Sequence, residues 1–360
     1  MSLDKKINAF VELGSFLIQY VLHHKNEKLT HLNRKFYSDF EILMNNQKPF
    51  NGWFTPENVA LAVDAVAKTL TKDGLEKWLN NYDIKQHLMP KRVGVVMAGN
   101  IPLVGFHDFL SVLITGNILV AKTSKEDNLL IKKLAEILIE IEPSFKDNII
   151  FTERLATQYC VVDAVIATGS NNTARYFEFY FGKYPNIIRK NRNSVAVLTG
   201  HETATDFINL GKDIFQYFGL GCRNVSKLYV PKGYSFNLFF ESILNDYQHV
   251  VNNNKYANNY DYNKAVYLLG NNQLLDNNFV MLKEDKSLSS PVAVLHYEYY
   301  NSIEELKITL DELKENIQCV VSNVAELNTF KLGQAQQPEL WDYADGVDTI
   351  QFLLELKELN

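Results

Sequence analysis

The segment Arg92-Val-Gly-Val-Val-Met-Ala-Gly99 is a short apolar run that ends in glycine, and a helical pattern over residues 102–115 follows it. A continuous apolar run of this length is typical of a strand that is buried on both faces of a parallel sheet. Pro102 lies where the first turn of the following helix is expected, a position that proline favours. The segment therefore predicts the first β-α unit of an α/β fold.

The same alternation continues toward the carboxyl end. The first series has predicted strands at 117–122, 148–151 and 164–168 and helices at 128–141 and 171–181. A second series has strands at 194–198, 279–282, 292–296 and 318–321 and helices at 204–218 and 303–313. Strands that alternate with helices predict parallel sheets covered by helices. We expect two α/β units, with the chain crossing between them near residue 198.

On the amino side of Arg92, residues 1 to about 90 predict a helical lead-in. Their apolar positions recur at helical spacing, as at Phe10, Leu13, Phe16 and Leu17. The asparagine-rich segment 251–259 instead predicts a mobile loop, because asparagine favours turns.

Composition excludes several classes of protein. The chain of 360 residues has a net charge of -6 and no basic stripe, so nucleic acid is not an expected partner. Its longest apolar runs are far shorter than the ~20 residues of a membrane helix, so no membrane span is predicted. The amino terminus lacks a signal-peptide pattern, and we expect a cytoplasmic protein. The three cysteines show neither disulfide nor zinc spacing, and no metal is expected.

Cys222 is the candidate nucleophile. It follows two glycines in Gly219-Leu-Gly-Cys222, and we expect it at the start of a helix, where backbone N–H groups and the helix dipole favour a thiolate. The alternative is a small buried hydrophobe. Cys160 and Cys319 lie within apolar runs, for which the structural interpretation is the stronger one.

Polar residues also follow three predicted strands of the first series. Asn100 follows the first strand and is a candidate donor to a developing oxyanion, or alternatively only a turn former. Lys122 and Ser124 follow the second strand, and Thr168-Gly169-Ser170 follows another. These residues could contact the ribose or phosphates of a cofactor, although a Gly-Ser turn before a helix is more often plain capping. No GxGxxG fingerprint is present.

Taken in order, four motifs resemble the signatures of the aldehyde dehydrogenase superfamily: Gly99-Asn-Ile-Pro102, Gly116-Asn-Ile-Leu-Val-Ala-Lys-Thr-Ser124, Thr168-Gly-Ser170 and Gly219-Leu-Gly-Cys222. Within the superfamily the chain is most similar to the acyl-CoA reductase branch, to which the fatty-acid reductases of bacterial bioluminescence belong. The likeness covers about residues 90 to 355 and includes Trp341-Asp-Tyr-Ala-Asp-Gly-Val-Asp-Thr-Ile350.

The resemblance implies a Rossmann-like cofactor domain and an α/β catalytic domain. Residues 1–197 would form the lead-in and the cofactor domain, 198–330 the catalytic domain, and 331–360 a segment that packs back on the core. It also implies that Cys222 accepts the acyl group, that Asn100 holds the thioester oxygen, and that Lys122, Gly169 and Ser170 contact the cofactor.

Two departures from the superfamily bear on the reaction. Oxidising relatives carry a Glu-Leu-Gly-Gly segment where this chain has Arg189-Lys-Asn-Arg-Asn193, so the carboxylate that activates water has no evident counterpart. Hydrolysis of an acyl-cysteine needs such a base, whereas reduction needs water kept away. A second family glutamate is replaced by Ser287-Leu-Ser-Ser290, which puts ribose contacts there in doubt. The departures favour reduction.

The expected cofactor is NADPH, with NADH as the alternative. NAD-preferring relatives often carry a glutamate three residues after the lysine that corresponds to Lys122, and this chain has Lys125 there. A lysine attracts a 2′-phosphate that a carboxylate repels. The competing interpretation is that Lys125 is a solvated lysine at a helix start.

The sequence predicts reduction of an acyl-CoA, with a fatty acyl group as the expected substrate, to an aldehyde through an acyl-cysteine. The expected partners are an acyl-CoA or another acyl thioester, and an acyl-transfer protein is a further candidate. The alternatives are an aldehyde dehydrogenase that forms an acid, and a noncatalytic partner protein with the same fold.

The sequence does not name the proton donor or the acyl chain length. Aromatic residues at 176–181 could line a fatty-acyl tunnel, but packing in the core is the favoured interpretation. The short chain before Arg92 leaves no clear place for the family's oligomerisation hairpin, so we expect an assembly unlike that of typical aldehyde dehydrogenases.

Overall fold

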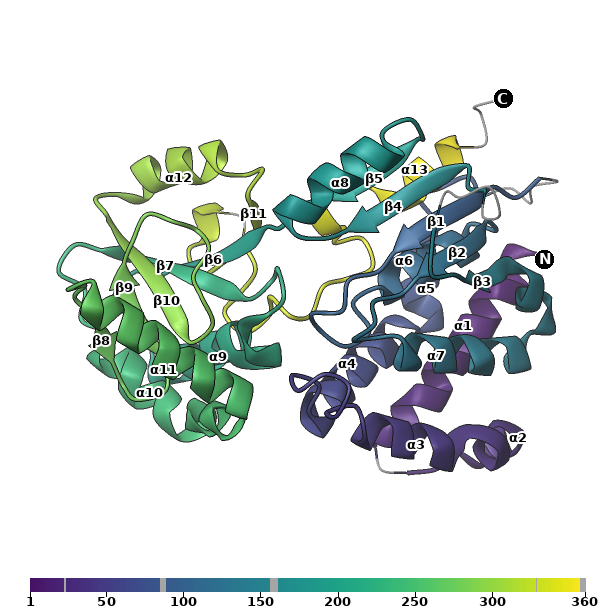
Figure 1. The fold of residues 1–360 in the computed structure, drawn as a ribbon, viewed down its shortest axis with the longest axis horizontal. Helices are drawn as coiled ribbons and strands as arrows, with labels where there is room; N and C mark the ends of the chain where they lie inside the picture. Colours follow the sequence, from purple (N-terminus) through teal and green to yellow (C-terminus); the bar gives the residue numbers. More distant parts are fainter. Residues whose placement is uncertain (23, 85–88, 156–160, 328, 357–360) are drawn as a thin grey trace. The chain divides into compact units, whose positions relative to one another are not determined.

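The computed structural model describes residues 1–22, 24–84, 89–155, 161–327 and 329–356. The chain divides into two compact units (Figure 1). Unit 1 contains Met1–Lys190 and Glu339–Asn360, and unit 2 contains Asn191–Pro338. Each unit has its own sheet with helices around it, so the predicted α/β fold class is confirmed.

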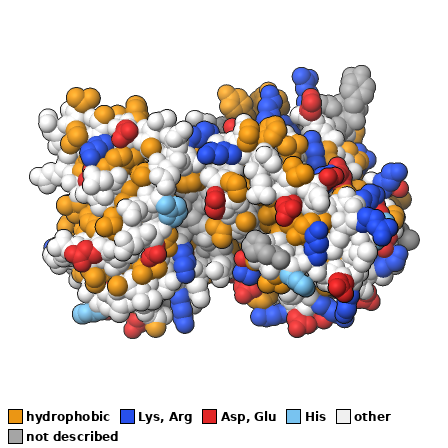
Figure 2. Space-filling model, turned by 90° about the horizontal axis from the view of Figure 1, so that it is seen from below, with side chains coloured by type: hydrophobic (Ala, Val, Ile, Leu, Met, Phe, Trp, Pro, Cys, Tyr) orange, Lys and Arg blue, Asp and Glu red, His pale blue; other side chains and the backbone are white. Residues whose placement is uncertain are grey.

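Charged side chains of both signs share the face drawn in Figure 2. Lys and Arg side chains lie among Asp and Glu side chains, with hydrophobic ones scattered between them. In the described part of the chain, no helix combines the length and the apolar character that crossing a bilayer requires.

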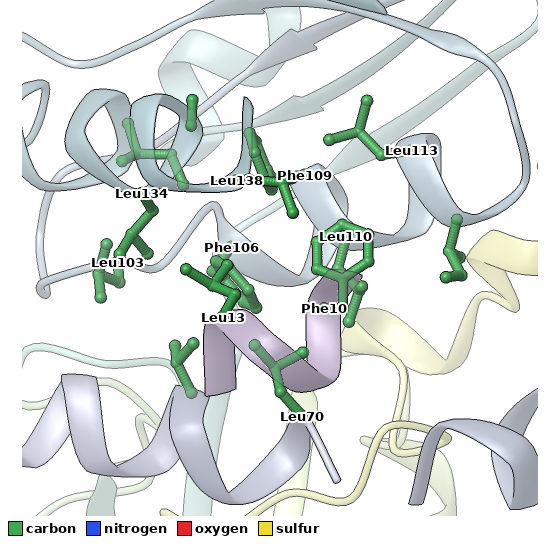
Figure 3. Packing of buried hydrophobic residues seen from close by; sticks show 14 of the residues in the cluster. Phe10, Leu13, Leu70, Leu103, Phe106, Phe109, Leu110, Leu113, Leu134 and Leu138 are labelled. Atoms are coloured by element: carbon green, nitrogen blue, oxygen red, sulfur yellow. The ribbon is translucent and has the colours of Figure 1, made fainter. Parts of the chain in front are cut away.

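The beginning of unit 1 is helical, as predicted. Its helices are α1 (Leu3–Val21), α2 (Thr30–Leu32), α3 (Ser38–Asn45), α4 (Pro56–Thr69) and α5 (Lys72–Leu79). The Ser2 hydroxyl caps α1 by accepting a hydrogen bond from the Lys5 N–H at 3.3 Å. Phe10 and Leu13 of α1 are fully buried and pack with leucine and phenylalanine side chains of α6 (Phe106–Ile114) and α7 (Leu129–Ile141) (Figure 3).

Unit 1 contains a five-stranded sheet in the order β3-β2-β1-β4-β5, and its neighbouring strands all pair in parallel. The strands are β1 (Arg92–Val96), β2 (Ile118–Lys122), β3 (Ile149–Phe151), β4 (Ala164–Thr168) and β5 (Asn186–Arg189). β1 is the central strand, which is why its sequence is a continuous apolar run. The sequence did not reveal β5, because this four-residue strand has polar residues at both ends.

Helices cover both faces of this sheet (Figure 1). α6 and α7 pack with α1 on one face, whereas α8 (Asn171–Phe181) covers the other, where Phe177 and Phe181 contact apolar side chains of the strands. The helix predicted over 102–115 begins only at Phe106. Leu103 has a φ of +57°, a left-handed conformation that an α-helix cannot contain.

Three of the five aromatic side chains of α8 face solvent. Tyr176, Phe179 and Tyr180 are 65%, 82% and 60% exposed, and only Phe177 and Phe181 pack against the core. The interpretation of this aromatic run as core is therefore wrong for the three exposed residues.

Unit 2 contains a six-stranded sheet in the order β11-β6-β7-β10-β9-β8, in which only β8 is antiparallel to its neighbour. The strands are β6 (Asn193–Val197), β7 (Val225–Pro231), β8 (Leu275–Asp276), β9 (Met281–Glu284), β10 (Val294–Tyr300) and β11 (Ile317–Ser322). The helices are α9 (Ala204–Phe215), α10 (Asn237–Tyr247), α11 (Asn254–Leu269) and α12 (Ile303–Glu312). α12 covers one face and the other three cover the opposite face (Figure 1).

The asparagine-rich segment 251–259 is not the predicted loop, because its residues from Asn254 onward form the start of α11. The Asn253 side chain accepts hydrogen bonds from the N–H groups of Lys255 and Tyr256, and so caps the helix. Tyr256 and Tyr260 bury one side of it. Packing of these tyrosines outweighs the weak helix propensity of the asparagines between them.

The carboxyl-terminal segment belongs to unit 1 and ends in α13 (Thr349–Glu355). The Tyr343 hydroxyl accepts a hydrogen bond from Trp78 Nε1 at 2.7 Å, and the Tyr82 hydroxyl donates to the Asp348 carboxylate at 2.6 Å. The chain passes from unit 1 to unit 2 after Lys190 and returns to unit 1 after Pro338. The sequence predicted these two boundaries after residues 197 and 330. The first difference arises because β6 pairs with β7 and β11 of unit 2.

Candidate active site

Unit 1 gathers most of the predicted site residues at one edge of its sheet. Asn100 follows β1, Lys122 ends β2 and Thr168 ends β4, so all three lie at the carboxyl ends of adjacent parallel strands. β1 leads to β2 and β3 on one side, whereas β4 and β5 lie on its other side. Ligands of open α/β sheets bind where the strand order reverses in this way. The reversal falls between β1 and β4.

The turn that carries Asn100 is held at both ends by side chains from other segments. Asn51 donates from its amide to the Gly99 carbonyl at 3.2 Å, and the Asp127 carboxylate accepts from the Leu103 N–H at 2.8 Å. Asn100 itself is exposed. Sequence reasoning missed both Asn51 and Asp127, because neither belongs to a motif that marks it as a loop anchor.

Lys122 and Ser124 lie on the β2 side of this edge. The Lys122 carbonyl accepts a hydrogen bond from the Met97 N–H at 3.0 Å, which extends the pairing of β1 with β2. The Ser124 hydroxyl accepts from the Glu126 N–H at 3.2 Å. Lys125 is exposed in the loop that leads to α7. A side chain at Gly99 would collide with Ser124, so the two loops pack closely.

Thr168, Gly169 and Ser170 form the passage from β4 to α8. Ser170 is the N-cap residue of α8, and its hydroxyl accepts from the Thr173 N–H at 3.3 Å. A Cβ at Gly169 would lie 2.9 Å from the Phe177 ring, so only glycine fits this approach of strand to helix. The capping interpretation of Ser170 is correct. A residue that caps a helix can also contact a cofactor.

Arg189, at the start of the segment that replaces the family's glutamate motif, has a structural partner. Its guanidinium forms a buried, two-pronged ion pair with Asp108 of α6, at 2.6 and 2.9 Å, and donates to the Thr349 hydroxyl at 3.1 Å. The pair connects β5 with α6 and α13. Breaking one partner of a buried pair leaves an uncompensated charge, so this arginine stabilises unit 1.

Cys222 is exposed and lies in the turn before β7, not at the start of a helix as predicted. The run Val225, Leu228, Tyr229 and Val230 instead packs as a strand in the middle of the unit 2 sheet. The expected helix dipole at the thiol is therefore absent. The Cys222 carbonyl accepts a hydrogen bond from the Ser194 hydroxyl at 2.9 Å.

Asn224 organises the turn around Cys222. Its side-chain oxygen accepts from the Gly221 N–H at 2.8 Å. Its amide nitrogen donates to the carbonyls of Asp213, Ile214 and Gln216, at 3.0, 3.3 and 2.9 Å. One buried amide thus joins the turn to the end of α9. Sequence reasoning missed this role of Asn224, because three of its four hydrogen bonds go to residues 8 to 11 positions away.

The chain enters this turn through three successive left-handed residues, Tyr217, Phe218 and Gly219, with φ of 53°, 58° and 76°. Only glycine adopts this conformation freely, and each of the other two costs roughly 1–2 kcal/mol. Strain of this kind persists only where the surroundings fix it. The backbone just before Cys222 is therefore set by its packing.

A pocket of about 300 Å³ lies in unit 2 beside this turn, at the amino ends of β6, β7 and β10. One part of its wall is apolar, with Phe215, Phe218, Leu220, Tyr256, Val280, Val292 and Leu295. The polar part contains Asn191, Arg192, Asn193, Asn224, Ser226, Ser289 and Ser290. Gly221 lines the pocket next to Cys222, and the described lining contains no Asp or Glu.

The serine-rich segment that borders the pocket is held by its backbone. The Lys227 ammonium donates to the Lys286 carbonyl at 2.7 Å, His296 Nδ1 to the Ser287 carbonyl at 3.0 Å, and the Ser226 hydroxyl to the Leu288 carbonyl at 2.7 Å. Burial lowers the pKa of His296 below its ordinary value, so the ring is neutral at physiological pH. These side chains fix the segment that places Ser289 and Ser290 in the pocket wall.

Two further cysteines and the two histidines nearest to Cys222 in the sequence are the other candidates for a chemical role. Cys319 is buried and lies 3.0 Å from the Ser194 hydroxyl, in keeping with its structural interpretation, and Cys160 lies outside the described residues. His201 and His249 are exposed and are not part of the described pocket lining. Within the described ranges no three His, Cys, Asp or Glu side chains form a cluster that could hold a metal ion.

The comparison with protein families decides the identity of the fold. The family model described as acyl-CoA reductase (LuxC) matches residues 20–237. The chain belongs to the acyl-CoA reductase (LuxC) family. None of the curated proteins compared with this acyl-CoA reductase family member matches it.

Solved structures similar to this LuxC-family chain are aldehyde dehydrogenases. Aldehyde dehydrogenase 21 from Physcomitrella patens, in complex with succinate, is 11% identical with a TM-score of 0.67 and covers 99% of this chain and 84% of its own. The NAD-dependent aldehyde dehydrogenase from Sinorhizobium meliloti is 12% identical, with a TM-score of 0.61 and coverages of 91% and 72%. An indole-3-acetaldehyde dehydrogenase with NAD+ is 13% identical, with a TM-score of 0.59 and coverages of 91% and 73%.

These likenesses confirm the predicted aldehyde-dehydrogenase-like fold. The family and the fold together indicate an oxidoreductase whose reaction involves an aldehyde. The roles of individual residues rest on their chemistry and their setting in each unit.

Proposed function

We propose that this protein reduces an acyl-CoA thioester to an aldehyde through an acyl-cysteine formed on Cys222. The observation that carries the proposal is the setting of Cys222. It is exposed on a turn that Asn224 and a strained backbone hold in place, next to a pocket whose described lining has an apolar wall and no carboxylate. A fixed nucleophile beside a pocket with one apolar wall and no carboxylate in its described lining suits acyl transfer without hydrolysis.

The proposed reaction joins transfer of the acyl group to Cys222 with reduction by a hydride. The Cys222 thiolate attacks the thioester carbonyl, the C–S bond to coenzyme A breaks, and the departing thiolate takes a proton. The acyl-cysteine then gains a hydride, and the new oxyanion reforms a C=O bond as the bond to Cys222 breaks. The products are coenzyme A, the aldehyde and the regenerated thiolate, so one hydride, which carries two electrons, and one proton are consumed in each cycle. We assign Asn100 as an amide donor to the thioester oxygen.

A reduced nicotinamide dinucleotide supplies the hydride when it is bound. The edge of the unit 1 sheet suits such a cofactor, since the strand order reverses there and α8 begins at this edge, directly after Ser170. Indole-3-acetaldehyde dehydrogenase, which shares the fold, binds NAD+. We assign Lys122, Ser124, Thr168, Gly169 and Ser170 to this cofactor site.

Oxidation of an aldehyde to an acid would require a base that activates water against the acyl-cysteine. The segment where relatives carry that glutamate begins here with Arg189, which is engaged in its buried pair with Asp108. The described pocket lining beside Cys222 offers no carboxylate either. Both observations support reduction over oxidation.

The deciding experiment follows NADPH absorbance with a series of acyl-CoA thioesters of increasing chain length. We expect oxidation of NADPH that depends on the thioester in the native protein and in Cys319→Ser, and no oxidation in Cys222→Ser. Cys319 is the matched control because it is a buried cysteine of the same unit. Mass spectrometry without cofactor should find the acyl group on the peptide that contains Cys222.

Three outcomes would contradict the proposal. Equal rates in native protein and Cys222→Ser would exclude an acyl-cysteine at this residue. Acid formation from aldehydes, without thioester reduction, would indicate an aldehyde dehydrogenase. Absence of labelling and turnover, with retained binding of an acyl-transfer protein, would indicate a noncatalytic partner. A chain-length optimum among the thioesters would define the acyl group.

We assign NADPH as the preferred cofactor because of Lys125. Its ammonium is exposed in the loop after β2, where it can attract a 2′-phosphate. Lys125→Glu should shift the ratio of kcat/KM for NADPH over NADH toward NADH by about tenfold, since an exposed charge contributes roughly 1 kcal/mol. Lys146→Glu makes the same charge change at another exposed site of unit 1 and should leave the ratio unchanged. An unchanged ratio in Lys125→Glu would remove Lys125 from the cofactor site.

A further inference from the structure

The turn between β1 and α6 has an unusual backbone beside Asn100. Leu103 is a branched residue with a φ of +57°, and its side chain is buried among the hydrophobic side chains of unit 1 (Figure 3). The left-handed conformation is unfavourable for leucine, so something must hold it. Burial fixes the side chain of Leu103, and a hydrogen bond to its N–H fixes the peptide.

That hydrogen bond comes from Asp127. One carboxylate oxygen of Asp127 accepts from the Leu103 N–H at 2.8 Å, and the side chain is 6% exposed. The other oxygen is buried and has no hydrogen-bond partner within the described part of the chain. Burial raises the pKa of Asp127 to about 7. Burial of a carboxyl group with one oxygen left without a partner is costly to stability.

Asp127 also belongs to the loop that carries the predicted cofactor residues Lys122, Ser124 and Lys125, and α7 begins two residues after it. The same loop touches the other end of the Asn100 turn, where Ser124 packs against Gly99 so closely that a Cβ would not fit. The loop after β2 thus contacts the Asn100 turn at two points, with Ser124 at Gly99 and with Asp127 at Leu103.

We propose that Asp127 is a positioning residue, which joins the loop after β2 to the turn after β1 and thereby fixes the amide of Asn100. This inference rests on the proposed function, because it assigns Asn100 to the thioester oxygen. Asp127 does not touch the substrate in this role. It acts through the Leu103 peptide.

The structural part of the inference is tested by hydrogen exchange of the full-length protein. In Asp127→Ala, amides in the peptide that spans residues 99–105 should exchange at least tenfold faster than in the native protein. Asp127→Asn keeps an acceptor oxygen in the same shape and should restore most of the protection. Glu126→Gln removes an exposed carboxylate one residue earlier and should change nothing. Unchanged exchange in Asp127→Ala would overturn the inference, whether or not the protein reduces thioesters.

The functional part is a double-mutant comparison. The rate of coenzyme A release from an acyl-CoA, without cofactor, should fall at least tenfold in Asp127→Ala and in Asn100→Ala. The double variant should be no slower than Asn100→Ala, because both changes remove the same interaction. Asp127→Asn should recover most of the rate.

Multiplied effects in the double variant, or an unchanged release rate in Asp127→Ala, would overturn the assignment of Asp127 to Asn100. If the native protein releases no coenzyme A, the proposed function fails, and the exchange experiment still decides whether Asp127 holds the turn. Thermal unfolding of each variant shows whether a lower rate reflects loss of the fold.

Discussion

The turn that carries Asn100 and the turn that carries Cys222 are both irregular, yet they are held in different ways. The first depends on Asn51 and Asp127, which come from distant parts of unit 1, and one of these is an ionisable carboxyl group. The second depends on Asn224, a neutral amide within the turn itself, which contacts carbonyls at the end of α9. One turn is therefore fixed by long-range contacts that include a titratable group, and the other by neutral contacts of a residue within the turn.

The largest effect expected from this difference concerns two buried asparagines. Asn224 and Asn51 are each 3% exposed, but Asn224 makes four hydrogen bonds to its turn and to α9, whereas Asn51 makes one to the turn it holds. Asn224→Ala should lower the free energy of unfolding by about 4 kcal/mol, because buried carbonyls lose their donor. Asn51→Ala should cost about 2 kcal/mol, because the Gly99 carbonyl loses its donor and the Trp53 N–H loses its acceptor.

Urea unfolding followed by circular dichroism measures both variants, and hydrogen exchange assigns each loss to unit 2 or unit 1. Because Asn224 holds the turn that carries Cys222, acylation of Cys222 should be slower in Asn224→Ala than in Asn51→Ala. The Cys222→Ser protein serves as the inactive reference in this assay. Equal destabilisation by the two substitutions would mean that the local network around Cys222 has no special weight.

The second prediction concerns pH. Burial raises the pKa of Asp127 to about 7 and that of Asp213, near the Cys222 turn, to about 6, from 3.8. A raised carboxyl pKa favours the protonated folded state, so stability is greatest below pH 4 and is lost as the pH rises through the folded value. Between pH 5 and pH 8 this loss is on the order of 2 to 3 kcal/mol for Asp127 and about 1 kcal/mol for Asp213.

Asp127→Asn does not titrate, so its free energy of unfolding should fall less than that of the native protein between these pH values. All three tryptophans, Trp53, Trp78 and Trp341, belong to unit 1, so their fluorescence in urea follows the unit that contains Asp127. Asp213→Asn serves as the matched variant in unit 2 and should leave the tryptophan signal unchanged. A native pH slope retained in Asp127→Asn would show that Asp127 is ionised in the folded state throughout this range.

Features that depend on local contacts could be predicted from the sequence, whereas features that depend on long-range contacts could not. β4 and α8 were predicted at their observed bounds, because periodicity and the cap Ser170 are local signals. The Asn100 turn was recognised, but its anchor Asp127 was not, since an aspartate in a loop looks solvated until its burial is known. The order of the motifs identified the superfamily.

Errors occurred where tertiary packing outweighed local preference. The asparagines of α11 are poor helix formers, but Tyr256 and Tyr260 bury that helix. The glycines before Cys222 suggested a helix start, although Gly219 with φ +76° ends a left-handed run that leads into β7. Pairing of a strand in the middle of a sheet depends on neighbours that are distant in the sequence, and no local pattern reports them.

The smallest expected changes in stability come from glycine substitutions in the two turns. Gly99 is required because a side chain would not fit, whereas Gly219 is required because of its backbone conformation. Gly99→Ala places a Cβ against Ser124, 2.6 Å from the Ser124 Cβ, and should cost about 2 kcal/mol through overpacking. Gly219→Ala should cost about 1 kcal/mol, because its φ of +76° is unfavourable for alanine, while the nearest atom lies 3.3 Å away. Ser124→Gly removes the obstacle to Gly99→Ala and should restore its stability, and it should not help Gly219→Ala. Urea unfolding of the single and double variants tests this, and a Gly99→Ala protein that Ser124→Gly fails to rescue would show that backbone conformation, and not packing between the two loops, requires glycine beside Asn100.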